Sequence, residues 1–407
     1  MIHVKKSAVM LTSDRQIDRR ILLSAESLKA AGWHVTIIAM PLDSETSDEG
    51  KAVRIGSNLN KATRENKILA AYRWIRRHIP MNGRLMRWMK QLAWRYLVDQ
   101  EYFYLKLFHS TASRYSPQVF VANDLPMLPV AKVVAEKCGA LLVYDSHELY
   151  SEQEFSKREQ RRWAQIEAKY IRECSAVITV NQSIANELKK RYSLNHVHVI
   201  YNAERVKSIP QSSRRLHELL KIKPDKKIVL LQGGVSAGRN LEILVSAMRY
   251  VTNEHIVLVI LGDGLLVRKL KKIAALQGLN ARVYFHDAVP QNELLTLTAS
   301  ADAGVIPYQA NCLNNLYCTP NKLFEFIAAG IPIIATDLPE IRNLVEGNSV
   351  GMVGDTSSPR AMAGLIDDFF SNERRFVYWK SQLALTRERV CWEQEEKKLV
   401  AIYEALL

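Results

Sequence analysis

The stretch Thr319-Pro-Asn-Lys-Leu-Phe-Glu-Phe-Ile-Ala-Ala-Gly-Ile-Pro-Ile-Ile-Ala335 predicts a helix that runs directly into a buried strand. Thr319 is a good N-cap, and Pro320 suits the first helical position, where its missing N–H costs nothing. Apolar residues follow at spacings of three and four, and Gly330 ends the helix. The apolar run Ile331–Ala335 is typical of a parallel sheet. The stretch therefore predicts an α/β fold.

Polar groups gather at the start of this predicted helix. The backbone N–H groups of Asn321 and Lys322 lack partners within the helix, so together with the positive end of the helix dipole they can hold a phosphate. Lys322 adds a charge, and Glu325, one turn further along, can accept hydrogen bonds from a sugar diol. The segment alone leaves an alternative open, in which this is a capped core helix with a solvated Lys and Glu.

Length and composition indicate an ordinary globular protein. The 407 residues suffice for two or three domains, with 48% apolar and 24% charged residues. The five cysteines form no CxxC pair, and no apolar stretch is long enough to span a bilayer. The first residues are too polar for a signal peptide, so we expect a cytoplasmic protein. The net charge of +14 favours anionic partners such as nucleotides, nucleic acid or an anionic membrane surface.

The N-terminal part alternates between strand and helix patterns. Lys6–Thr12 predicts a strand, Ile17–Ala30 a helix and Trp33–Ala39 a second strand, which is the repeating element of a doubly wound parallel sheet. No GxGxxG follows the first strand, so the sequence does not support a dehydrogenase-type dinucleotide site.

Residues 58–108 interrupt this alternation with a basic segment rich in aromatic residues. Between Lys61 and Tyr96 there are ten Lys or Arg residues against one acid, interleaved with tryptophans. The spacing predicts an amphipathic helical insertion whose basic face, including Arg84 and Arg87, can meet anionic lipid headgroups. Alternatively, the apolar face packs on its own domain and the basic face is solvated. No nucleic-acid recognition motif is present, so we expect no nucleic-acid partner.

Polar side chains follow two predicted strands further along. Asn123 and Asp124 come after the strand Gln118–Ala122, and His147 and Glu148 follow the strand Leu141–Tyr144. In open α/β sheets the ligand crevice lies outside the carboxyl ends of the strands. These four side chains are therefore candidates for a binding site.

A second α/β series begins after a linker-like stretch at residues 203–215. Its first predicted strand, Lys227–Leu231, leads into the loop Gln232-Gly-Gly-Val-Ser-Ala-Gly-Arg239. Small residues such as Gly233 and Gly234 let a ligand approach the backbone, and Arg239 arrives beside the next helix start. This combination suits a diphosphate. Two doubly wound domains in sequence would leave a cleft between them, the usual place for a ligand.

Taken together, these motifs resemble the retaining glycosyltransferases of the GT-B fold in the large family 4 group, which depend on nucleotide sugars. The resemblance covers nearly the whole chain: Asp14…Gly32-Trp33-His34-Val35, Val143-Tyr-Asp-Ser-His-Glu148, Gln232-Gly-Gly…Gly-Arg239, Leu261-Gly-Asp-Gly264 and the run from Val283 to Ala335. It implies two Rossmann-like domains, each a doubly wound parallel sheet, with an interdomain cleft.

The resemblance also implies roles for individual residues. Arg239, Lys322 and the N–H groups at Asn321 would bind the donor diphosphate, and Glu325 would bind the nucleotide ribose. His147 would hydrogen-bond the reacting sugar. The implied donor-binding set is Gly233, Gly234, Arg239, Asp287, Asn321, Lys322 and Glu325, with His147, Arg239 and Lys322 as the catalytic residues. Asn123, Asp124 and Glu148 are candidates on the acceptor side.

Two positions depart from the family pattern. The first glutamate of the Glu-x7-Glu motif is Tyr317 here, and the first basic residue of the usual phosphate pair falls at Gly234. We expect Lys322 to supply that second charge. No Asp-x-Asp motif is present, so we predict no metal site and no cofactor, since Arg, Lys and a helix end can meet the phosphate charge.

We therefore expect an N-terminal acceptor-side domain over residues 1–205, containing the insertion 58–108, and a C-terminal nucleotide-sugar-binding domain over 206–388. Residues 389–407 would form a helix that returns to the first domain, and the apolar residues of Arg387–Leu407 follow a helical pattern.

The predicted function is hexosyl transfer from a nucleotide diphosphate sugar to a hydroxyl acceptor with retention. The expected acceptor is a saccharide or lipid-linked saccharide of surface polysaccharide or glycolipid assembly. The enzyme would then be cytoplasmic and peripheral on the inner face of the cell membrane. Two alternatives stay open: another GT-B enzyme, such as a sugar-nucleotide epimerase or an inverting transferase, and a non-catalytic nucleotide-sugar-binding scaffold.

Overall fold

The computed structural model describes residues 6–41, 52–55, 99–206 and 213–407. The chain divides into two compact units. Unit 1 comprises Met1–Val180, Ile184–Val199 and Lys398–Leu407, and unit 2 comprises Asn181–Ser183 and Ile200–Lys397. The domain limits expected at residues 205 and 388 stay predictions. Most of the basic segment 58–108 lies outside the described residues.

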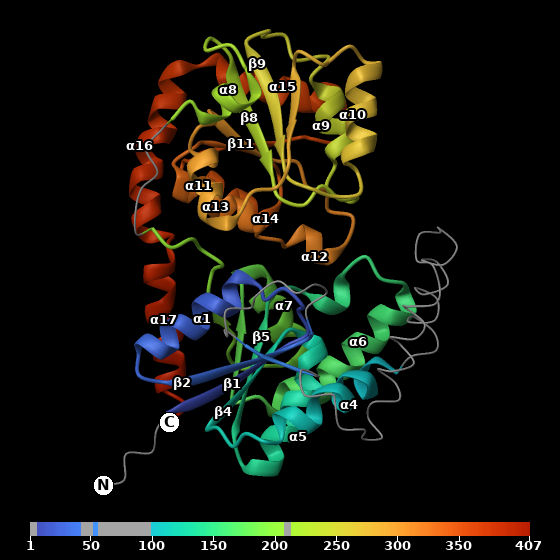
Figure 1. The fold of residues 1–407 in the computed structure, drawn as a ribbon, viewed down its shortest axis with the longest axis vertical. Helices are drawn as coiled ribbons and strands as arrows, with labels where there is room; N and C mark the ends of the chain where they lie inside the picture. Colours follow the sequence, from blue (N-terminus) through green and yellow to red (C-terminus); the bar gives the residue numbers. More distant parts are fainter. Residues whose placement is uncertain (1–5, 42–51, 56–98, 207–212) are drawn as a thin grey trace. The chain divides into compact units, whose positions relative to one another are not determined.

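Unit 1 is built on a parallel sheet that has seven strands among the described residues, in the order β3-β2-β1-β4-β5-β6-β7. Figure 1 labels β1, β2, β4 and β5 of this sheet. The strands are β1 Ser7–Thr12, β2 His34–Ala39, β3 Val53–Arg54, β4 Val119–Asn123, β5 Leu141–Ser146, β6 Ala176–Thr179 and β7 His198–Val199. In β1, β4 and β5 almost every residue is buried. These strands are covered on both faces, so their sequences are apolar along the whole length and do not alternate between apolar and polar residues.

Some of the helices of unit 1 begin at side-chain caps. The helices of this unit are α1 Arg19–Ala30, α4 Gln100–Ala112, α5 Leu128–Cys138, α6 Lys157–Tyr170 and α7 Gln182–Tyr192, and α5 packs against both α4 and α6. The first helix was predicted from Ile17, but it begins at Arg19 because the carboxylate of Asp18 accepts from the backbone N–H of Arg20. In α6, Ser156 and Glu159 form a reciprocal capping box.

The end of the chain belongs to unit 1. The indole N–H of Trp33 donates a hydrogen bond to Oε1 of Glu404 at 3.0 Å. The rings of Trp33 and Tyr403 meet edge to face, with centroids 5.6 Å apart. Both aromatic side chains are buried, so the last turn of α17 (Trp392–Glu404) is part of the core of this unit.

Unit 2 contains a second parallel sheet, with six strands in the order β10-β9-β8-β11-β12-β13 in the part of the chain described. Its strands are β8 Lys227–Gln232, β9 Ile256–Leu261, β10 Val283–His286, β11 Ala303–Ile306, β12 Ile333–Thr336 and β13 Gly351–Gly354. Its helices are α8 Arg215–Leu220, α9 Leu241–Ala247, α10 Val267–Leu276, α11 Gln291–Thr298, α12 Leu313–Leu316, α13 Asn321–Ala329, α14 Pro339–Val345, α15 Pro359–Ser371 and α16 Glu373–Arg389.

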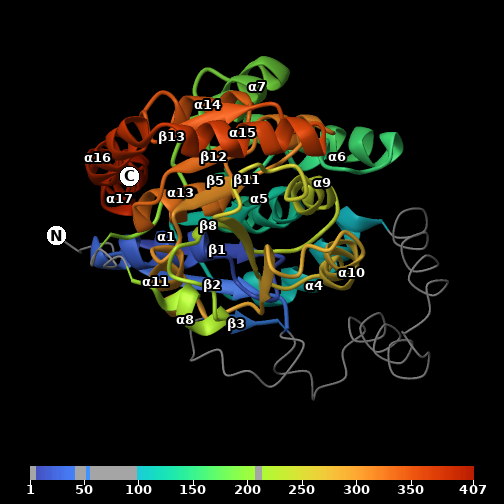
Figure 2. The ribbon, with the colours of Figure 1, turned by 90° about the horizontal axis from the view of Figure 1, so that it is seen from above.

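Two apolar layers enclose the second sheet. Residues of α9, α10 and α15 form one buried cluster with the sheet, and residues of α11, α13 and α14 form the other. Figures 1 and 2 show these two groups of helices on opposite faces. Within α13 every residue after Asn321 is buried, so this helix lies inside the unit and its first turn is held firmly.

The structure corrects two local predictions. Helix α13 begins at Asn321 and its N-cap is Pro320, which provides no side-chain cap, so Thr319 is not the cap. The C-terminal helix expected over residues 389–407 is present but shorter, as α17, Trp392–Glu404. Helix α16 ends at Arg389, and a new helix begins at Trp392. The side chain of Trp392 is fully buried, and its backbone N–H donates to the Glu204 carbonyl at 2.8 Å. The chain changes direction before Trp392 because both contacts hold that residue.

Among the described helices, none is both long enough and apolar enough to cross a bilayer.

Candidate functional site

The carboxyl ends of three neighbouring strands in unit 2 are tied together by backbone hydrogen bonds. The N–H of Gly233 donates to the Leu261 carbonyl at 2.9 Å, and the N–H of Gly262 donates to the His286 carbonyl at 2.9 Å. A Cβ atom added to Gly262 would lie 2.0 Å from the carbonyl oxygen of Gly233. Only glycine permits this close approach of the two loops, which fixes the loop that follows β8.

Two cationic side chains meet at one aromatic ring beside this loop. Nη1 of Arg239 donates to the hydroxyl of Tyr308 at 2.7 Å, and Cζ of Arg239 lies 5.2 Å from the centroid of the ring. Nζ of Lys322, from the first turn of α13, lies 5.2 Å from the same centroid. We call Arg239, Lys322 and Tyr308 the cation pair and its ring.

The two glycines of the loop lie next to these cations. A Cβ atom at Gly233 would be 3.9 Å from Nζ of Lys322, and one at Gly234 would be 3.9 Å from Nη1 of Arg239. The structure therefore brings together four of the residues predicted from the sequence. Because neither glycine carries a side chain, the backbone beside the two cations stays open to an anion.

Lys322 is buried, and the carboxylate of Glu325, one turn along α13, acts on it without forming an ion pair. Its residue is 5% exposed, and within the described residues no acidic side chain forms an ion pair with it. Burial, followed by repulsion from Arg239, lowers the pKa of Lys322 to about 7. The alternative in which Lys322 and Glu325 are solvated is wrong, since Glu325 is also buried. Such a site favours an anion that restores the charge balance.

Glu325 is oriented from the sheet. Its Oε2 accepts a hydrogen bond from the side-chain amide of Gln232, the last residue of β8. The carbonyl oxygen of that amide accepts from the hydroxyl of Thr298 at 2.8 Å. These buried bonds fix the direction of the carboxylate before any ligand binds.

Two further candidates of unit 2 lie at the edge of this group. The side chain of Asn321 is exposed and accepts a hydrogen bond from Nδ2 of Asn202 at 2.6 Å. Asp287 is exposed directly after β10, and its carbonyl oxygen lies 2.8 Å from Nδ1 of His286. In the described part of the chain no hydrogen bond or ion pair joins Asp287 to Arg239 or Lys322, so the structure does not bring it to the cation pair.

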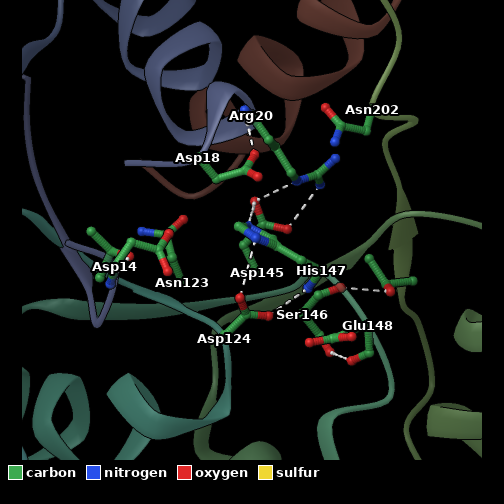
Figure 3. Close-up of polar contacts among 12 residues, drawn as sticks. Asp14, Asp18, Arg20, Asn123, Asp124, Asp145, Ser146, His147, Glu148 and Asn202 are labelled. Carbon is green, nitrogen blue, oxygen red and sulfur yellow. Dashed lines mark hydrogen bonds and ion pairs between the residues drawn. The ribbon is translucent and has the colours of Figure 1, made fainter. Parts of the chain in front are cut away.

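In unit 1, His147 lies between two carboxylates (Figure 3). Its Nδ1 is 3.3 Å from Oδ2 of Asp124, and its Nε2 is 3.5 Å from Oδ2 of Asp145. The backbone N–H of His147 also donates to Oδ1 of Asp124 at 3.0 Å. Asp124 thus holds both the main chain and the ring of His147.

A buried arginine completes this arrangement. Arg20 donates through Nη2 to Oδ1 of Asp145 at 2.8 Å and through Nε to Oδ2 at 3.2 Å. Burial disfavours the Asp145 carboxylate, but Arg20 and His147 outweigh it and hold the pKa of Asp145 well below its usual range. Burial likewise opposes the imidazolium, yet Asp124 and Asp145 raise the pKa of His147 well above its ordinary value. His147 therefore carries a positive charge at neutral pH.

The other unit 1 candidates are engaged locally. Nδ2 of Asn123 donates to the Leu11 carbonyl at 3.0 Å inside the sheet, and Asn123 is buried. The carboxylate of Glu148 accepts from the side-chain amide of Gln153. Of the acceptor-side candidates, the structure thus brings only Asp124 into contact with His147.

Five residues that hold these arrangements together were not singled out from the sequence as site residues: Arg20, Asp145, Gln232, Thr298 and Tyr308. Tyr308 and Gln232 both stand at the carboxyl end of a strand, so the strand-end rule could have found them. Arg20 sits in the first turn of α1 and reaches Asp145, 125 positions away. No local pattern indicates that contact. Among the residues described, no group of three or more His, Cys, Asp or Glu side chains is arranged to hold a metal ion.

Two family models match consecutive parts of the chain. The model for a glycosyl transferase 4-like domain matches residues 17–203, and the model for glycosyl transferases group 1 matches residues 212–384. The two matched ranges contain β2 to β7 but not β1. They also contain His147 with its partners, and the cation pair and its ring.

The chain is similar to several known proteins, all at low sequence identity. The chain is 22% identical over 255 residues to a D-inositol 3-phosphate glycosyltransferase of Xylanimonas cellulosilytica, a match that covers 58% of each protein. It therefore spans less than two thirds of that relative's length. Among solved structures, a sucrose-phosphate synthase from Thermosynechococcus elongatus superposes with a TM-score of 0.74 at 16% identity, covering 98% of this chain and 99% of that one. The Anabaena protein HepE in complex with UDP-glucose superposes with a TM-score of 0.69 at 16% identity, covering 98% and 99%.

Two Rossmann-like units with parallel sheets, superposing on these structures along nearly their whole length, define a protein of the GT-B fold. The chain belongs to the glycosyl transferases group 1, with a glycosyl transferase 4-like N-terminal domain. The fold and the family predicted from the sequence are thus confirmed.

Proposed function

We propose that this protein transfers a sugar from a nucleoside diphosphate sugar to a hydroxyl group of an acceptor. The observation that carries the proposal is the cation pair of Arg239 and Lys322 beside the open backbone of Gly233 and Gly234. The structural relative HepE was crystallised with UDP-glucose, which supports a donor of this class.

In this proposal the cation pair binds the diphosphate of the donor. When the bond from the sugar to the diphosphate breaks, negative charge grows on the departing nucleotide. Arg239, Lys322 and the first N–H groups of α13, including that of Asn321, stabilise that charge most strongly as it develops. Since both cations are held in place before the donor arrives, little reorganisation is needed during the reaction.

Glu325 binds the ribose of the nucleotide in this scheme. Its carboxylate is already oriented by Gln232 and lies one turn along α13 from Lys322. A carboxylate can accept hydrogen bonds from both hydroxyls of a diol. Asp287, which follows β10 and is exposed, would then contribute near the base.

We further propose that His147 contacts the sugar that is transferred, and that transfer proceeds with retention. Its Nε2 lies 3.5 Å from Asp145, too far for a strong hydrogen bond, so this N–H can donate to a substrate oxygen. The positive charge of the ring suits it to bind an oxygen on which negative charge develops. Asp124 and Glu148 of the same unit, with Asn123 supporting the strand end, would face the acceptor.

The acceptor that we favour is a lipid-linked saccharide at an anionic membrane surface. Helix α6 exposes Lys157, Arg158, Arg161 and Lys169. Arg162 of this helix pairs with Asp99 at 2.7 Å, so α6 adjoins the described end of the basic segment 58–108. Cations in such number attract anionic headgroups. Surface polysaccharide or glycolipid assembly is therefore the proposed setting.

The transfer proposal is tested by incubating the protein with UDP-, GDP- and ADP-sugars and a set of acceptors, and measuring transfer and donor hydrolysis. Lys322→Ala should raise the donor KM or lower kcat markedly, while Lys272→Ala, at an exposed position of α10, should change neither. An unchanged kcat/KM for Lys322→Ala would discard the role of this lysine. Nucleotide-sugar binding without turnover would favour a scaffold, and a change within the donor sugar would favour an epimerase.

Flotation with liposomes tests the membrane proposal. The protein should float with vesicles that contain anionic lipid and not with neutral vesicles. Substituting Arg84, Arg87 and Arg95 together by glutamine should reduce flotation, as should the pair Arg158 and Arg161. Absence of binding to anionic vesicles, or binding that neither set of substitutions changes, would remove the membrane surface from the proposal.

A further inference from the structure

Tyr308 joins two cations that come from different elements. It lies just beyond β11, Arg239 comes from the loop after β8, and Lys322 from the first turn of α13. The hydroxyl of Tyr308 accepts from Nη1 of Arg239 at 2.7 Å, and its ring centroid is 5.2 Å from both Cζ of Arg239 and Nζ of Lys322. Tyr308 is 8% exposed, so its ring has a fixed place in the core.

The contacts of Tyr308 oppose the repulsion between the cations. A cation within about 6 Å of an aromatic centroid is attracted by the ring quadrupole, more strongly when water is excluded. The phenol oxygen gives the guanidinium of Arg239 a defined direction. Without the ring, two like charges in a buried site would turn away from each other toward water.

The hydroxyl of Tyr308 also keeps a proton to donate. Burial raises the pKa of Tyr308 to about 12, so the phenol is neutral at physiological pH. Its oxygen accepts from Arg239 through a lone pair, which leaves the O–H bond directed elsewhere. An anion bound by the two cations would offer an acceptor for that proton.

We propose that Tyr308 is a positioning residue that holds Arg239 and Lys322 on one ring so that both engage a single diphosphate. This inference rests on the proposed function at one point only, where the diphosphate is taken to be that of the nucleoside diphosphate sugar. It assigns a selectivity to the site: a diphosphate can meet both cations at once, whereas a single phosphate gains less from the second one.

Inorganic pyrophosphate and inorganic phosphate are the probes, because neither depends on the base or the sugar. Calorimetric titration of the full-length protein should show tighter binding of pyrophosphate than of phosphate. Tyr308→Phe, which keeps the ring and removes the acceptor for Arg239, should weaken pyrophosphate binding about 3- to 10-fold. Tyr308→Leu, which removes the ring as well, should weaken it further and bring the two affinities closer together.

The matched control is Tyr284→Phe. The hydroxyl of Tyr284 donates to the Ala281 carbonyl at 3.2 Å, in the same unit but outside the cation pair and its ring. It should leave pyrophosphate binding unchanged. Thermal unfolding of each variant checks that the variant is folded. The position of Arg239 and Lys322 is tested by the pyrophosphate affinity, not by the melting temperature.

Unchanged pyrophosphate affinity in both Tyr308 variants would overturn the inference. The same loss in Tyr284→Phe, or no pyrophosphate binding by the unmodified protein, would also overturn it. Failure of the transfer proposal looks different: pyrophosphate binding would still respond to Tyr308 while no nucleotide sugar is turned over. A response to Tyr308 together with a retained preference for pyrophosphate in Tyr308→Leu would reject the selectivity.

Discussion

The side-chain amide of Gln232 donates a hydrogen bond to the carboxylate of Glu325, and both residues are buried in unit 2. Gln232 ends the strand β8 and Glu325 lies on α13, 93 positions later. Thr298 donates to the carbonyl of the same amide, and exchanging the carbonyl and the NH2 group of Gln232 would remove the donor that Glu325 needs.

Removing this amide should therefore leave a buried carboxylate without its donor. We expect Gln232→Leu to lower the free energy of unfolding by about 1–3 kcal/mol, measured by urea denaturation. If Glu325 binds the ribose, binding of the preferred nucleoside diphosphate should weaken while pyrophosphate binding should not. Gln277→Leu, whose partner is Ser246 on the other helical layer, is the control and should leave nucleotide binding intact. Equal nucleotide affinity in Gln232→Leu would argue against a ribose contact at Glu325.

A second prediction concerns the cost of burying Lys322. Its folded pKa of about 7 lies below the unfolded value, so between about pH 7 and 10.5 the unfolded chain binds more protons than the folded one. This lysine therefore destabilises the free protein at neutral pH, and stability rises with pH across that window. We expect Lys322→Met to raise the free energy of unfolding by about 1–4 kcal/mol and to weaken pyrophosphate binding. Lys272→Met is the surface control, and a destabilised Lys322→Met would show that the ammonium is well paired.

The same titration makes anion binding depend on pH. A bound diphosphate favours the charged ammonium of Lys322, so binding takes up a proton when the pH is above about 7. Above pH 7 the loss of the lysine proton should lower pyrophosphate affinity by up to about tenfold per unit, in addition to any change from the titration of pyrophosphate itself. Lys322→Arg keeps a permanent charge and should flatten the profile. Calorimetry from pH 6.5 to 9 measures this, and an equally steep profile in Lys322→Arg would assign the proton to another group.

The charge of His147 is open to direct measurement. Its folded pKa is raised, so its ion pairs contribute stability that is full below about pH 6.5 and is lost as the pH rises through the folded value. Asp145→Asn and Asp124→Asn should each lower the pKa of His147, observed through its imidazole nitrogen chemical shifts. Glu148→Gln, whose partner is Gln153, should leave it unchanged. If none of these substitutions alters the pKa of His147, the two carboxylates do not determine that pKa.

Helix α13 is closed at its carboxyl end by an arginine that lies over a glycine. A Cβ atom at Gly330 would lie 2.2 Å from Nη2 of Arg387, and Gly330 has φ = 73°. We expect Gly330→Ala to lower the free energy of unfolding by about 2–4 kcal/mol, through backbone strain and displacement of Arg387. Gly139→Ala, with a similar φ but open space around it, isolates the strain. Gly364→Ala, inside α15 with nothing nearby, should stabilise by about 0.5–1 kcal/mol.

The strands were predictable because each is a short apolar run between turn residues. The strand predicted over Lys227–Leu231 is β8, Lys227–Gln232, in which every residue after Lys227 is buried. The helix ends were less accurate, because they depend on which side chain caps them: Asp18 moves the start of α1 by two residues from the predicted Ile17. The break before Trp392 follows from its burial against Glu204, which no local pattern contains.

Part of the candidate site was predictable for a similar reason. Gly233, Gly234, Arg239 and Lys322 lie in motifs at strand or helix ends, and the structure brings them together. Tyr308 was missed because a tyrosine after a strand is usually a core residue. Its role in the site is visible only from its contacts with Arg239 and Lys322, which come from distant parts of the sequence.

The contact of Trp33 with Tyr403 and Glu404 decides how this protein can be cut into pieces. A gene fragment that stops at residue 199 would encode the first sheet but omit the aromatic and acidic partners of Trp33. Such a fragment would expose an indole and its apolar surroundings to water and would tend to aggregate. A usable half-protein would need residues 398–407 supplied through a short linker or by circular permutation, so that both ends of the polypeptide stay in the same fold.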